Sequence, residues 1–421
     1  MAPRNYDDVS FVRPSYKNPY WSRHGKKWKE EKVLILEPLI KWAGGKSNEI
    51  VQIEKLIPHN SFDRFIEPFF GGGAVFFHLE PDGAIISDKS RELMLIYEFL
   101  SEGRHREAFK IELFEYVKNW ERINVYMKIF GDLLLQLYNG YKVNAIGDYE
   151  LEKEVQNLFE QNITEFNGMF DNKFCVDVEN LQKTIQESVV AKLKRTKIKV
   201  DPENKFSEQS IKHNIETAFR SGFYVHFRHM MNQARLGTIK LSDEKKVANY
   251  YFIREFCYGG MFRFNASGEF NVPYGGMNYN RKNFRKKVDY LFSDKVRDLL
   301  RTAQKESMDF EELFKKYPPT EKDFIFLDPP YDTEFSEYEE NPFTKSDQIR
   351  LAEFLSGTPA KFILVIKETN FIHQLYSDRT KFNVLSFGKT YSYNIKSRFE
   401  RSVNHLVIHN MDITGKQFNP V

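Results

Sequence analysis

The sequence predicts an α/β protein with a doubly wound, Rossmann-like sheet that is interrupted by a mainly helical insertion. Three observations lead to this prediction. Residues 62–100 follow the order strand, glycine turn, helix, strand, acidic residue. Residues 105–250 contain apolar side chains at helical spacing and few Gly or Pro, and an apolar strand pattern returns at 323–328. With 421 residues, the chain is long enough for one core with a large insertion.

The first part of the core is expected to begin with a helical stretch near 48–57. A strand within 62–70 then ends in three glycines, which are followed by a helix at 74–79. A second strand at 84–88 leads to a helix at 93–100. After the insertion, further strands are expected at 323–328, 361–366 and 403–408.

The insertion carries a basic run at 192–199, whose alternation predicts an edge strand or a charged ribbon. Its lysines either protect a sheet edge or contact phosphates. A β-hairpin is expected over 261–275 with its turn at 266–268, and a basic cluster follows at 281–287.

Composition excludes several classes of site. The net charge of +3, from 62 basic and 59 acidic residues, does not by itself indicate a nucleic-acid partner. Two cysteines provide neither a disulfide framework nor a Cys-based zinc site. His213, His226 and His229 lack matching carboxylates, so we interpret them as solvated or core residues and expect no metal. No apolar run is long enough to cross a membrane and no secretory signal is present, so the expected compartment is the cytoplasm.

The first candidate binding motif is the segment from Glu67 through Pro68 and Phe69 to Gly71, Gly72 and Gly73. Glycines after a strand allow a tight turn and a close approach to a ligand. The spacing is not that of a dinucleotide site, and an acidic residue precedes the glycines. This suits a ligand with an adenosine, a positive sulfonium and an amino-acid tail, which is S-adenosylmethionine. Asp88, after the next strand, fits an acceptor for ribose hydroxyls, although a solvated strand-end residue is the simpler alternative.

The second motif reads Lys41-Trp42-Ala43-Gly44-Gly45-Lys46 and resembles a truncated phosphate loop without Walker A spacing. We expect no nucleoside triphosphate here. Instead, Lys46 is expected to hold the carboxylate of the ligand, and Trp42 to pack on its adenine.

The third motif is Asp328-Pro329-Pro330-Tyr331, directly after the apolar run 324–327. A carboxylate and a proline-held carbonyl can accept both hydrogens of an amino nitrogen whose lone pair is delocalised into an aromatic ring, which exposes that lone pair to a methyl donor. The prolines fix the backbone, and Tyr331 offers a face for stacking. A base inside a duplex must be flipped out to reach such a pocket. A rigid turn is the alternative interpretation of the tetrad alone.

Taken together, residues 38–46, 65–77, 87–97, 262–275 and 324–331 resemble the Dam-type family of DNA adenine-N6 methyltransferases. The motifs occur in the family's order, with cofactor motifs first, target recognition in the middle and the catalytic motif last. The resemblance implies that Asp328, Pro329, Pro330 and Tyr331 are catalytic. It also implies cofactor contacts from Trp42, Ala43, Gly44, Lys46, Glu67, Pro68, Phe69, Gly71, Gly73, Asp88 and Asp328.

The expected hairpin is similar to the DNA-contacting hairpin of this family. Arg263 matches an arginine that contacts a guanine, and Tyr258 matches an aromatic residue near the flipped base. The predicted DNA-binding residues are Tyr258, Met261, Arg263, Asn265, Asn271, Pro273 and Tyr274. Gly259 and Gly260 stand where the methylases that act on GATC carry Asn-Gly, so a different target sequence is expected.

The resemblance divides the chain into an extension (1–32), a cofactor-binding part of the core (33–104), a target-recognition part (105–290) and a catalytic part of the core (291–421). It implies a monomeric, nucleoid-associated enzyme that acts on double-stranded DNA, with a cognate restriction endonuclease as a candidate partner. Two alternatives stay open. One is an enzyme of the same fold that methylates N4 of cytosine, RNA or a protein amide, and the other is a sequence-specific DNA-binding protein without catalysis.

Overall fold

The computed structural model describes residues 36–42, 44–46, 49–58, 61–162, 166, 169–198, 206–261, 263–330, 343–390 and 402–412. The extension predicted at 1–32 lies outside these residues. So do Ala43 of the predicted cofactor loop and Tyr331 of the predicted catalytic motif.

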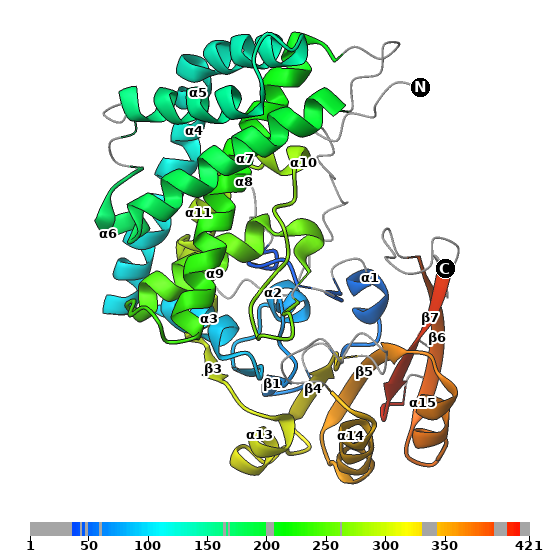
Figure 1. Ribbon diagram of the computed structural model, residues 1–421. Helices are drawn as coiled ribbons and strands as arrows, with labels where there is room; N and C mark the ends of the chain where they lie inside the picture. Colours follow the sequence, from blue (N-terminus) through cyan, green and yellow to red (C-terminus); the bar gives the residue numbers. More distant parts are fainter. Residues whose placement is uncertain are drawn as a thin grey trace, which may run out of the picture. The chain divides into compact units, whose positions relative to one another are not determined.

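The centre of the described fold is a seven-stranded sheet with the order β3-β2-β1-β4-β5-β7-β6 (Figure 1). Only β7 runs antiparallel to its neighbours β5 and β6, and the other neighbouring strands are parallel. The strands are β1 (Arg64–Glu67), β2 (Ala84–Ser87), β3 (Ala303–Glu306), β4 (Asp323–Leu327), β5 (Lys361–Lys367), β6 (Asn383–Thr390) and β7 (Ser402–His409). The structure is therefore a mixed α/β protein with a seven-stranded, mostly parallel sheet, and β1, β2, β4, β5 and β7 lie where the sequence predicted strands.

Alternate side chains of the central strands enter two different hydrophobic cores. Phe65 and Phe324 point to one face, and Ile66 and Ile325 point to the other. All five residues of β4 are buried, which explains the continuous apolar run in the sequence. The second face is covered by α13 (Phe310–Lys316), α14 (Lys345–Gly357) and α15 (Asn370–Leu375) (Figure 1).

The first face continues into the helical insertion through one core. Near the sheet lie α1 (Ile50–Ile53), α2 (Ala74–Leu79), α3 (Arg91–Ser101) and α12 (Asp294–Arg301). The insertion consists of α4 (Arg104–Lys142), α5 (Asp148–Gln161), α6 (Asn172–Cys175), α7 (Val178–Ile198), α8 (Glu208–Arg235), α9 (Asp243–Phe256), α10 (Met277–Asn280) and α11 (Phe284–Leu291). Its interior is rich in aromatic pairs, such as Trp120 with Phe256 at 4.2 Å between ring centroids.

The prediction of an edge strand or charged ribbon at 192–199 was wrong for its described residues, because 192–198 form the end of α7. Leu181, Ile185, Val189 and Leu193 follow one another at intervals of four and are all buried, so the helical period of the preceding residues continues into the basic run. Lys192, Lys194 and Lys197 are half-buried residues of this helix. Two strands, β3 and β6, were not predicted.

The predicted hairpin is present only in reduced form. The chain reverses at a turn in which Gly268 N donates to Asn265 O at 2.9 Å, and the described residues around it form two isolated antiparallel bridges, Phe264 with Phe270 and Cys257 with Tyr274. Regular strands do not flank this turn in the described residues.

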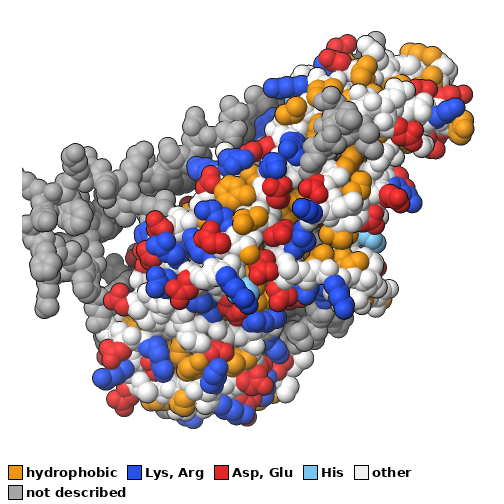
Figure 2. Space-filling view, turned by 90° about the vertical axis from the view of Figure 1, so that its left-hand side faces the viewer, with side chains coloured by type: hydrophobic (Ala, Val, Ile, Leu, Met, Phe, Trp, Pro, Cys, Tyr) orange, Lys and Arg blue, Asp and Glu red, His pale blue; other side chains and the backbone are white. Residues whose placement is uncertain are grey.

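Lys and Arg side chains are intermingled with Asp and Glu over the described surface of the face shown in Figure 2. This matches the balanced net charge of the sequence. None of the helices in the described part of the chain combines the length and apolar character that a membrane crossing requires.

Candidate active site

The predicted motifs meet at the carboxyl edge of the sheet. The strand order reverses between β1 and β4, which are neighbours, and ligands of open α/β sheets bind beyond the carboxyl ends at such a point. Glu67 is the last residue of β1, and Asp328 directly follows β4. Asp88 directly follows β2, the other neighbour of β1.

The glycine loop after β1 is held by buried hydrogen bonds on both sides of Gly71. The Gly71 N–H donates to Asp88 Oδ2 at 2.9 Å, and the Tyr97 hydroxyl donates to the Gly71 carbonyl at 2.9 Å. Gly71 has φ +49° and Gly73 has φ +67°, so both occupy the left-handed region that favours glycine. A Cβ atom on Gly71 would lie 2.6 Å from Trp42 Cδ1. The absence of a side chain at Gly71 is therefore what allows Trp42 to pack on the loop.

Trp42 is also held from the insertion by Arg254 of α9. The guanidinium carbon lies 4.5 Å from the centroid of the Trp42 ring, and Arg254 Nη2 donates to the Lys41 carbonyl at 2.9 Å. Arg254 is buried, and its charge also acts on Asp88. The loop of the second motif is thus fixed between the sheet and the insertion.

Lys46, which was expected to hold the carboxylate of the ligand, is buried and contacts Asp328. It is 1% exposed, its ammonium donates to the Gly44 carbonyl at 2.9 Å, and it forms an ion pair with Asp328 Oδ1. The Asp328 side chain is 19% exposed, so the pair joins a buried cation to a carboxylate that still reaches the surface of the site. The structure therefore brings the second and third motifs into direct contact.

Glu67 lies next to this pair. It is 3% exposed, and its Oε2 atom has no hydrogen-bond partner in the described structure. Burial raises the pKa of Glu67 well above its ordinary value, and the Asp328 carboxylate raises it further, whereas the backbone N–H of Phe76 acts in the opposite direction. A buried carboxyl oxygen without a partner is costly unless a ligand or a proton satisfies it.

Asp88 accepts hydrogen bonds from the backbone N–H groups of Gly71 and Ser90, each at 2.9 Å. Burial raises the pKa of Asp88, and these two N–H groups and the Arg254 charge act in the opposite direction.

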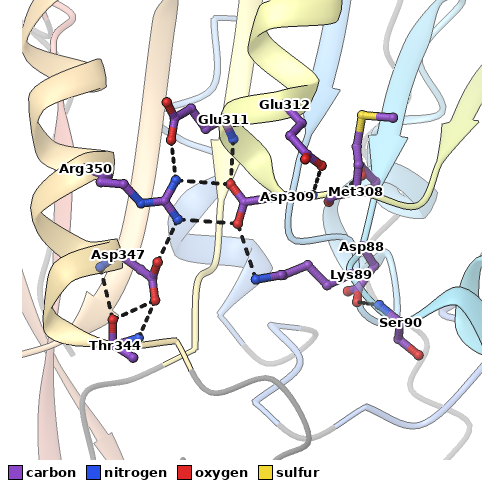
Figure 3. Close-up of polar contacts among 11 residues, drawn as sticks. Asp88, Lys89, Ser90, Met308, Asp309, Glu311, Glu312, Thr344, Asp347 and Arg350 are labelled. Atoms are coloured by element: carbon purple, nitrogen blue, oxygen red, sulfur yellow. Dashed lines mark hydrogen bonds and ion pairs between the residues drawn. The ribbon is translucent and has the colours of Figure 1, made fainter.

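The segment after β2 is braced by an ion-pair network around Arg350 of α14 (Figure 3). Arg350 contacts Asp309, Glu311 and Asp347, and Lys89 is joined to Asp309 at 3.3 Å. This network connects the carboxyl ends of β2 and β3 with α14.

The remaining residues of the two core motifs take different positions. Pro68 and Pro329 are buried, whereas Phe69 is half-buried and packs edge-on against Phe343 at 5.4 Å between centroids. The Pro330 carbonyl accepts a hydrogen bond from Gln348 Nε2 at 3.1 Å. Gly44 is exposed with φ +79°.

The predicted DNA-contacting residues fall into two groups. Arg263, Asn265 and Pro273 are exposed, and Tyr258, Met261 and Asn271 are half-buried. Arg263 Nε donates to Asn271 Oδ1 at 3.1 Å across the hairpin. Tyr274, by contrast, is buried among the helices, and its hydroxyl donates to Asn280 Oδ1 at 2.7 Å. Its place is that of a core residue, so Tyr274 is not among the residues that we assign to DNA contact.

Gly259 and Gly260, at the turn before the hairpin, have φ values of +65° and +66°. Asn is among the few other residues that tolerate this left-handed region. Both Gly259-Gly260 in this chain and the Asn-Gly pair of the methylases that act on GATC can therefore adopt the same backbone turn.

Two residues of the site were not identified from the sequence, Arg254 and Tyr97. The available signal for Arg254 was a lone cation within the apolar run 250–256, which indicates a buried charge with a specific partner. Tyr97 carried no such signal, because a tyrosine on an apolar helix face is an ordinary core residue.

Of the three histidines considered in the sequence, His226 lies in the core of the insertion. His226 is buried, and its ring nitrogens lie 2.9 Å from Asn180 Oδ1 and 3.0 Å from the Cys175 carbonyl. Burial lowers the pKa of His226 to about 4, so it is a neutral core residue. Within the residues that the structure describes, no group of three or more His, Cys, Asp or Glu side chains could hold a metal ion.

Comparison with known proteins gives a family and full-length relatives. The family model for D12 class N6 adenine-specific DNA methyltransferases matches residues 42–174 and 185–393. The type II methyltransferase M.CviBI of Paramecium bursaria Chlorella virus NC1A is 24% identical over 89% of this chain and 100% of its own length. The type II methyltransferase M.MjaIII of Methanocaldococcus jannaschii is 26% identical over 86% of this chain and 91% of its own length. The DNA adenine methylase of Escherichia coli K12 is 23% identical over 41% of this chain and 59% of its own length.

Proposed function

The chain belongs to the D12 class of N6 adenine-specific DNA methyltransferases, and from this premise we propose that its active site is the carboxyl edge of β1 and β4. The enzyme methylates N6 of adenine in DNA and uses S-adenosylmethionine. The observation that carries the proposal is the contact between Lys46 and Asp328, which joins two of the sequence motifs next to Glu67. The alternatives of a cytosine, RNA or protein substrate, or of a protein without catalysis, are not favoured by an adenine-specific DNA family.

The residues at this edge fit the cofactor. Gly71 and Gly73 have left-handed backbones that bring the loop close to a ligand, and Trp42 provides an aromatic face for an adenine. Asp88 fits an acceptor for ribose hydroxyls. The Glu67 oxygen that has no partner in the described structure fits a position near the positive sulfonium. When bound, the cofactor supplies an electrophilic methyl group.

From the sequence we expected Lys46 to hold the carboxylate of the cofactor. Its ion pair with Asp328 makes Asp328 the better candidate for its partner. A buried ammonium in contact with the Asp328 carboxylate fixes the direction of that carboxylate. An ionised carboxylate accepts hydrogen bonds and does not donate them, as required for gripping an amino group. Lys46 therefore acts through Asp328.

We assign the two acceptors for the adenine amino group to Asp328 and to the Pro329 carbonyl. The Pro330 carbonyl already accepts from Gln348, so the other proline carbonyl is the better candidate. Two fixed acceptors direct both hydrogens and leave the nitrogen lone pair aimed at the methyl donor. Tyr331, outside the described residues, keeps its proposed role as a stacking face for the flipped base.

The helical insertion and the hairpin are proposed to recognise the target sequence in double-stranded DNA. Arg263 is exposed and carries the fork of donors that matches the O6 and N7 acceptors of guanine. Its cross-hairpin bond to Asn271 limits its rotamers before DNA arrives. Tyr258 and Met261, at the start of this segment, are proposed to lie near the flipped adenine.

The biological setting is also a proposal. The two full-length relatives are type II methyltransferases, and we infer that this enzyme belongs to a restriction-modification system with a cognate restriction endonuclease. We propose a monomeric enzyme of the cytoplasm that associates with the nucleoid. Its core is formed by residues 33–104 and 291–421, its target-recognition part by 105–290, and its N-terminal extension by 1–32.

The test of the catalytic assignment is Asp328→Ala. Loss of one positioned acceptor should lower kcat by about 10²–10³-fold or more. Cofactor affinity should weaken, because the Lys46 ammonium loses its carboxylate counter-charge beside the site, and DNA affinity should be largely retained. Methylation is measured by transfer of labelled methyl groups to plasmid DNA, and modified positions are located by sequencing.

Asp323→Asn is the matched control, because Asp323 lies at the opposite end of β4 and pairs with Arg64 at 2.7 Å. It should reduce stability and leave kcat within about twofold of the wild type. Near-normal turnover of Asp328→Ala would show that the assigned chemistry is wrong.

A further inference from the structure

One face of α8 holds the second half of the hairpin through a series of side chain to backbone hydrogen bonds. The residues involved are Tyr224, Arg228, Asn232 and Arg235, which we call the α8 ladder. Their spacing of four, four and three residues places them on the same side of the helix. Their partners on the hairpin are the backbone groups of Gly268, Phe270 and Val272.

The contacts follow the hairpin in order. The Val272 carbonyl accepts from the Tyr224 hydroxyl at 2.9 Å and from Arg228 Nη1 at 3.1 Å. The Gly268 carbonyl accepts from Arg235 Nη1 at 3.2 Å. The direction of the hairpin segment is thus opposite to that of the helix.

Asn232 makes the central contact of the ladder, in which its side chain both donates and accepts a hydrogen bond. Its Nδ2 donates to the Phe270 carbonyl at 3.1 Å, and its Oδ1 accepts from the Phe270 N–H at 2.8 Å. A carboxamide offers one donor and one acceptor side by side, as a backbone peptide does, so Asn232 replaces a residue of a neighbouring strand. Asn232 is buried at 8% exposure.

The helical and extended periods match between Arg228 and Asn232. Four residues along a helix advance by about 6.0 Å, and the two residues from Val272 to Phe270 advance by about 6.7 Å along a strand. Every second carbonyl of an extended segment points to the same side, so Phe270 and Val272 can both be contacted, whereas Gly268, with φ +73°, belongs to the turn. A helix can therefore serve as the missing neighbour of this segment.

The ladder determines which side chains face outward. Phe270, Val272 and Tyr274 are buried, whereas Asn271 is half-buried and Pro273 is exposed. A slip of one residue would exchange these two sets. Backbone pairing across the described residues of the hairpin is limited to two isolated bridges, Phe264 with Phe270 and Cys257 with Tyr274, and a few hydrogen bonds such as that from Asn271 N to the Arg263 carbonyl at 3.3 Å. Such a short two-stranded pairing is only marginally stable alone, so the contacts with α8 add to what fixes its register.

We propose that the α8 ladder fixes the register of the DNA-contacting hairpin, and that Asn232 is a positioning residue for the choice of DNA sequence. The inference rests on the proposed function of the hairpin. Asn232 itself does not contact DNA. It acts through the placement of Arg263 and Asn271, which are joined across the hairpin.

The test compares Asn232→Leu and Asn232→Asp with the wild type. The target is first located by sequencing N6-methyladenine in unmethylated genomic DNA treated with the wild-type enzyme. Duplexes that contain this target, and each of its single-base neighbours, then give kcat/KM for every enzyme. For Asn232→Leu we expect a 10- to 100-fold loss on the target and at least about tenfold weaker discrimination against the neighbours, since a mismatched base pair is normally worth roughly tenfold or more. Cofactor affinity should stay within twofold.

Asn249→Leu is the matched control. Asn249 is a buried asparagine of α9 whose Nδ2 donates to the Phe227 carbonyl at 3.0 Å, so its loss removes the same type of bond from the helical core without touching the hairpin. It should lower thermal stability and leave discrimination unchanged. Asn232→Asp keeps the acceptor for the Phe270 N–H and loses the donor, so it should be folded and intermediate in discrimination.

The outcomes separate the inference from the proposed function. A wild-type enzyme that modifies no adenine in any DNA overturns the proposed function. A wild type with a defined target, together with folded Asn232 variants whose discrimination equals that of Asn249→Leu, overturns the role of the ladder alone. Folding of each variant is checked by circular dichroism before the kinetic comparison.

Discussion

Replacement of Gly71 by alanine tests the proposed cofactor pocket most directly. An added Cβ would lie 2.6 Å from Trp42 Cδ1 and 3.0 Å from Trp42 Nε1. Carbon atoms in contact are normally about 3.5–4.0 Å apart, so the ring must move by roughly 1 Å. In the free enzyme, Trp42 can leave its place on the loop. In the complex, the ring is needed against the adenine.

The magnitude follows from two contributions. An alanine at φ +49° costs about 1–2 kcal/mol in stability, with or without cofactor. Moving Trp42 away from Arg254, which lies 4.5 Å from the ring centroid, loses a further amount of about 0.5–2 kcal/mol. Cofactor binding requires the Trp42 ring at a position that the Cβ added at position 71 blocks. We therefore expect the lost Trp42–Arg254 contact and the lost contact between Trp42 and the adenine to weaken cofactor affinity by about 10- to 100-fold, or roughly 1.4–2.8 kcal/mol.

The assay is calorimetric titration with S-adenosylmethionine, together with thermal unfolding. Gly103→Ala is the matched comparison, because Gly103 lies outside the proposed site and also has a positive φ of +82°, with no atom of the described structure within 4 Å of its added Cβ apart from its chain neighbours. It should show the strain in unfolding and a much smaller change in affinity. If Gly71→Ala binds the cofactor as tightly as Gly103→Ala, Trp42 does not form a wall of the pocket.

Two further predictions concern stability. The pKa of Glu67 is raised in the folded state above its ordinary value of 4.5. The protonated Glu67 side chain therefore makes its whole contribution to stability below pH 4.5, and this contribution is lost as the pH rises through the raised pKa of the folded state. Denaturant titrations between pH 5 and 8 should therefore show the wild type losing stability relative to Glu67→Gln, by at most about 1.4 kcal/mol per pH unit, and the opposite trend would refute a raised pKa. Arg350→Met removes the centre of the network in Figure 3, and because this side chain is 35% exposed, the expected loss is only about 1–2 kcal/mol in the free energy of unfolding. Turnover should change by less than about twofold, and a large loss of turnover would show that the network does more than brace the sheet edge.

The core of the fold could be predicted because its signals are local. The strand at Arg64–Glu67, the glycines at 71–73 and the helix at Ala74–Leu79 lie close together in the sequence, and each has a recognisable composition. The strand β3 was missed because its sequence, Ala-Gln-Lys-Glu, is polar and lies at an edge of the sheet. The basic run near the end of α7 has the alternation of a strand when it is taken alone. Its helical period becomes visible only together with the buried residues that precede it in α7.

The contacts within the site were less predictable than its members. Asp328, Lys46, Glu67 and Asp88 were each chosen from sequence, and the structure places them at one edge of the sheet. The partner of Lys46 lies 282 residues away, and no local pattern could identify it. Likewise, the burial of Tyr274 depends on the packing of helices that the sequence outlined only as a group.

The pairing of β1 with β4 has a consequence for how the chain is made. Arg64 and Asp323 are partners in register and are 259 residues apart. At a synthesis rate of roughly 5–20 residues per second, the ribosome needs about 13–50 s to deliver the second strand after the first. The helical segment between them ends with α11 at Leu291, before β4 begins at Asp323, whereas one edge of β1 waits for its neighbour until β4 is made. Nascent chains that stop between these two points should therefore carry the proposed DNA-recognition part without the proposed methyl-transfer centre, and they are the species that we expect chaperones to hold.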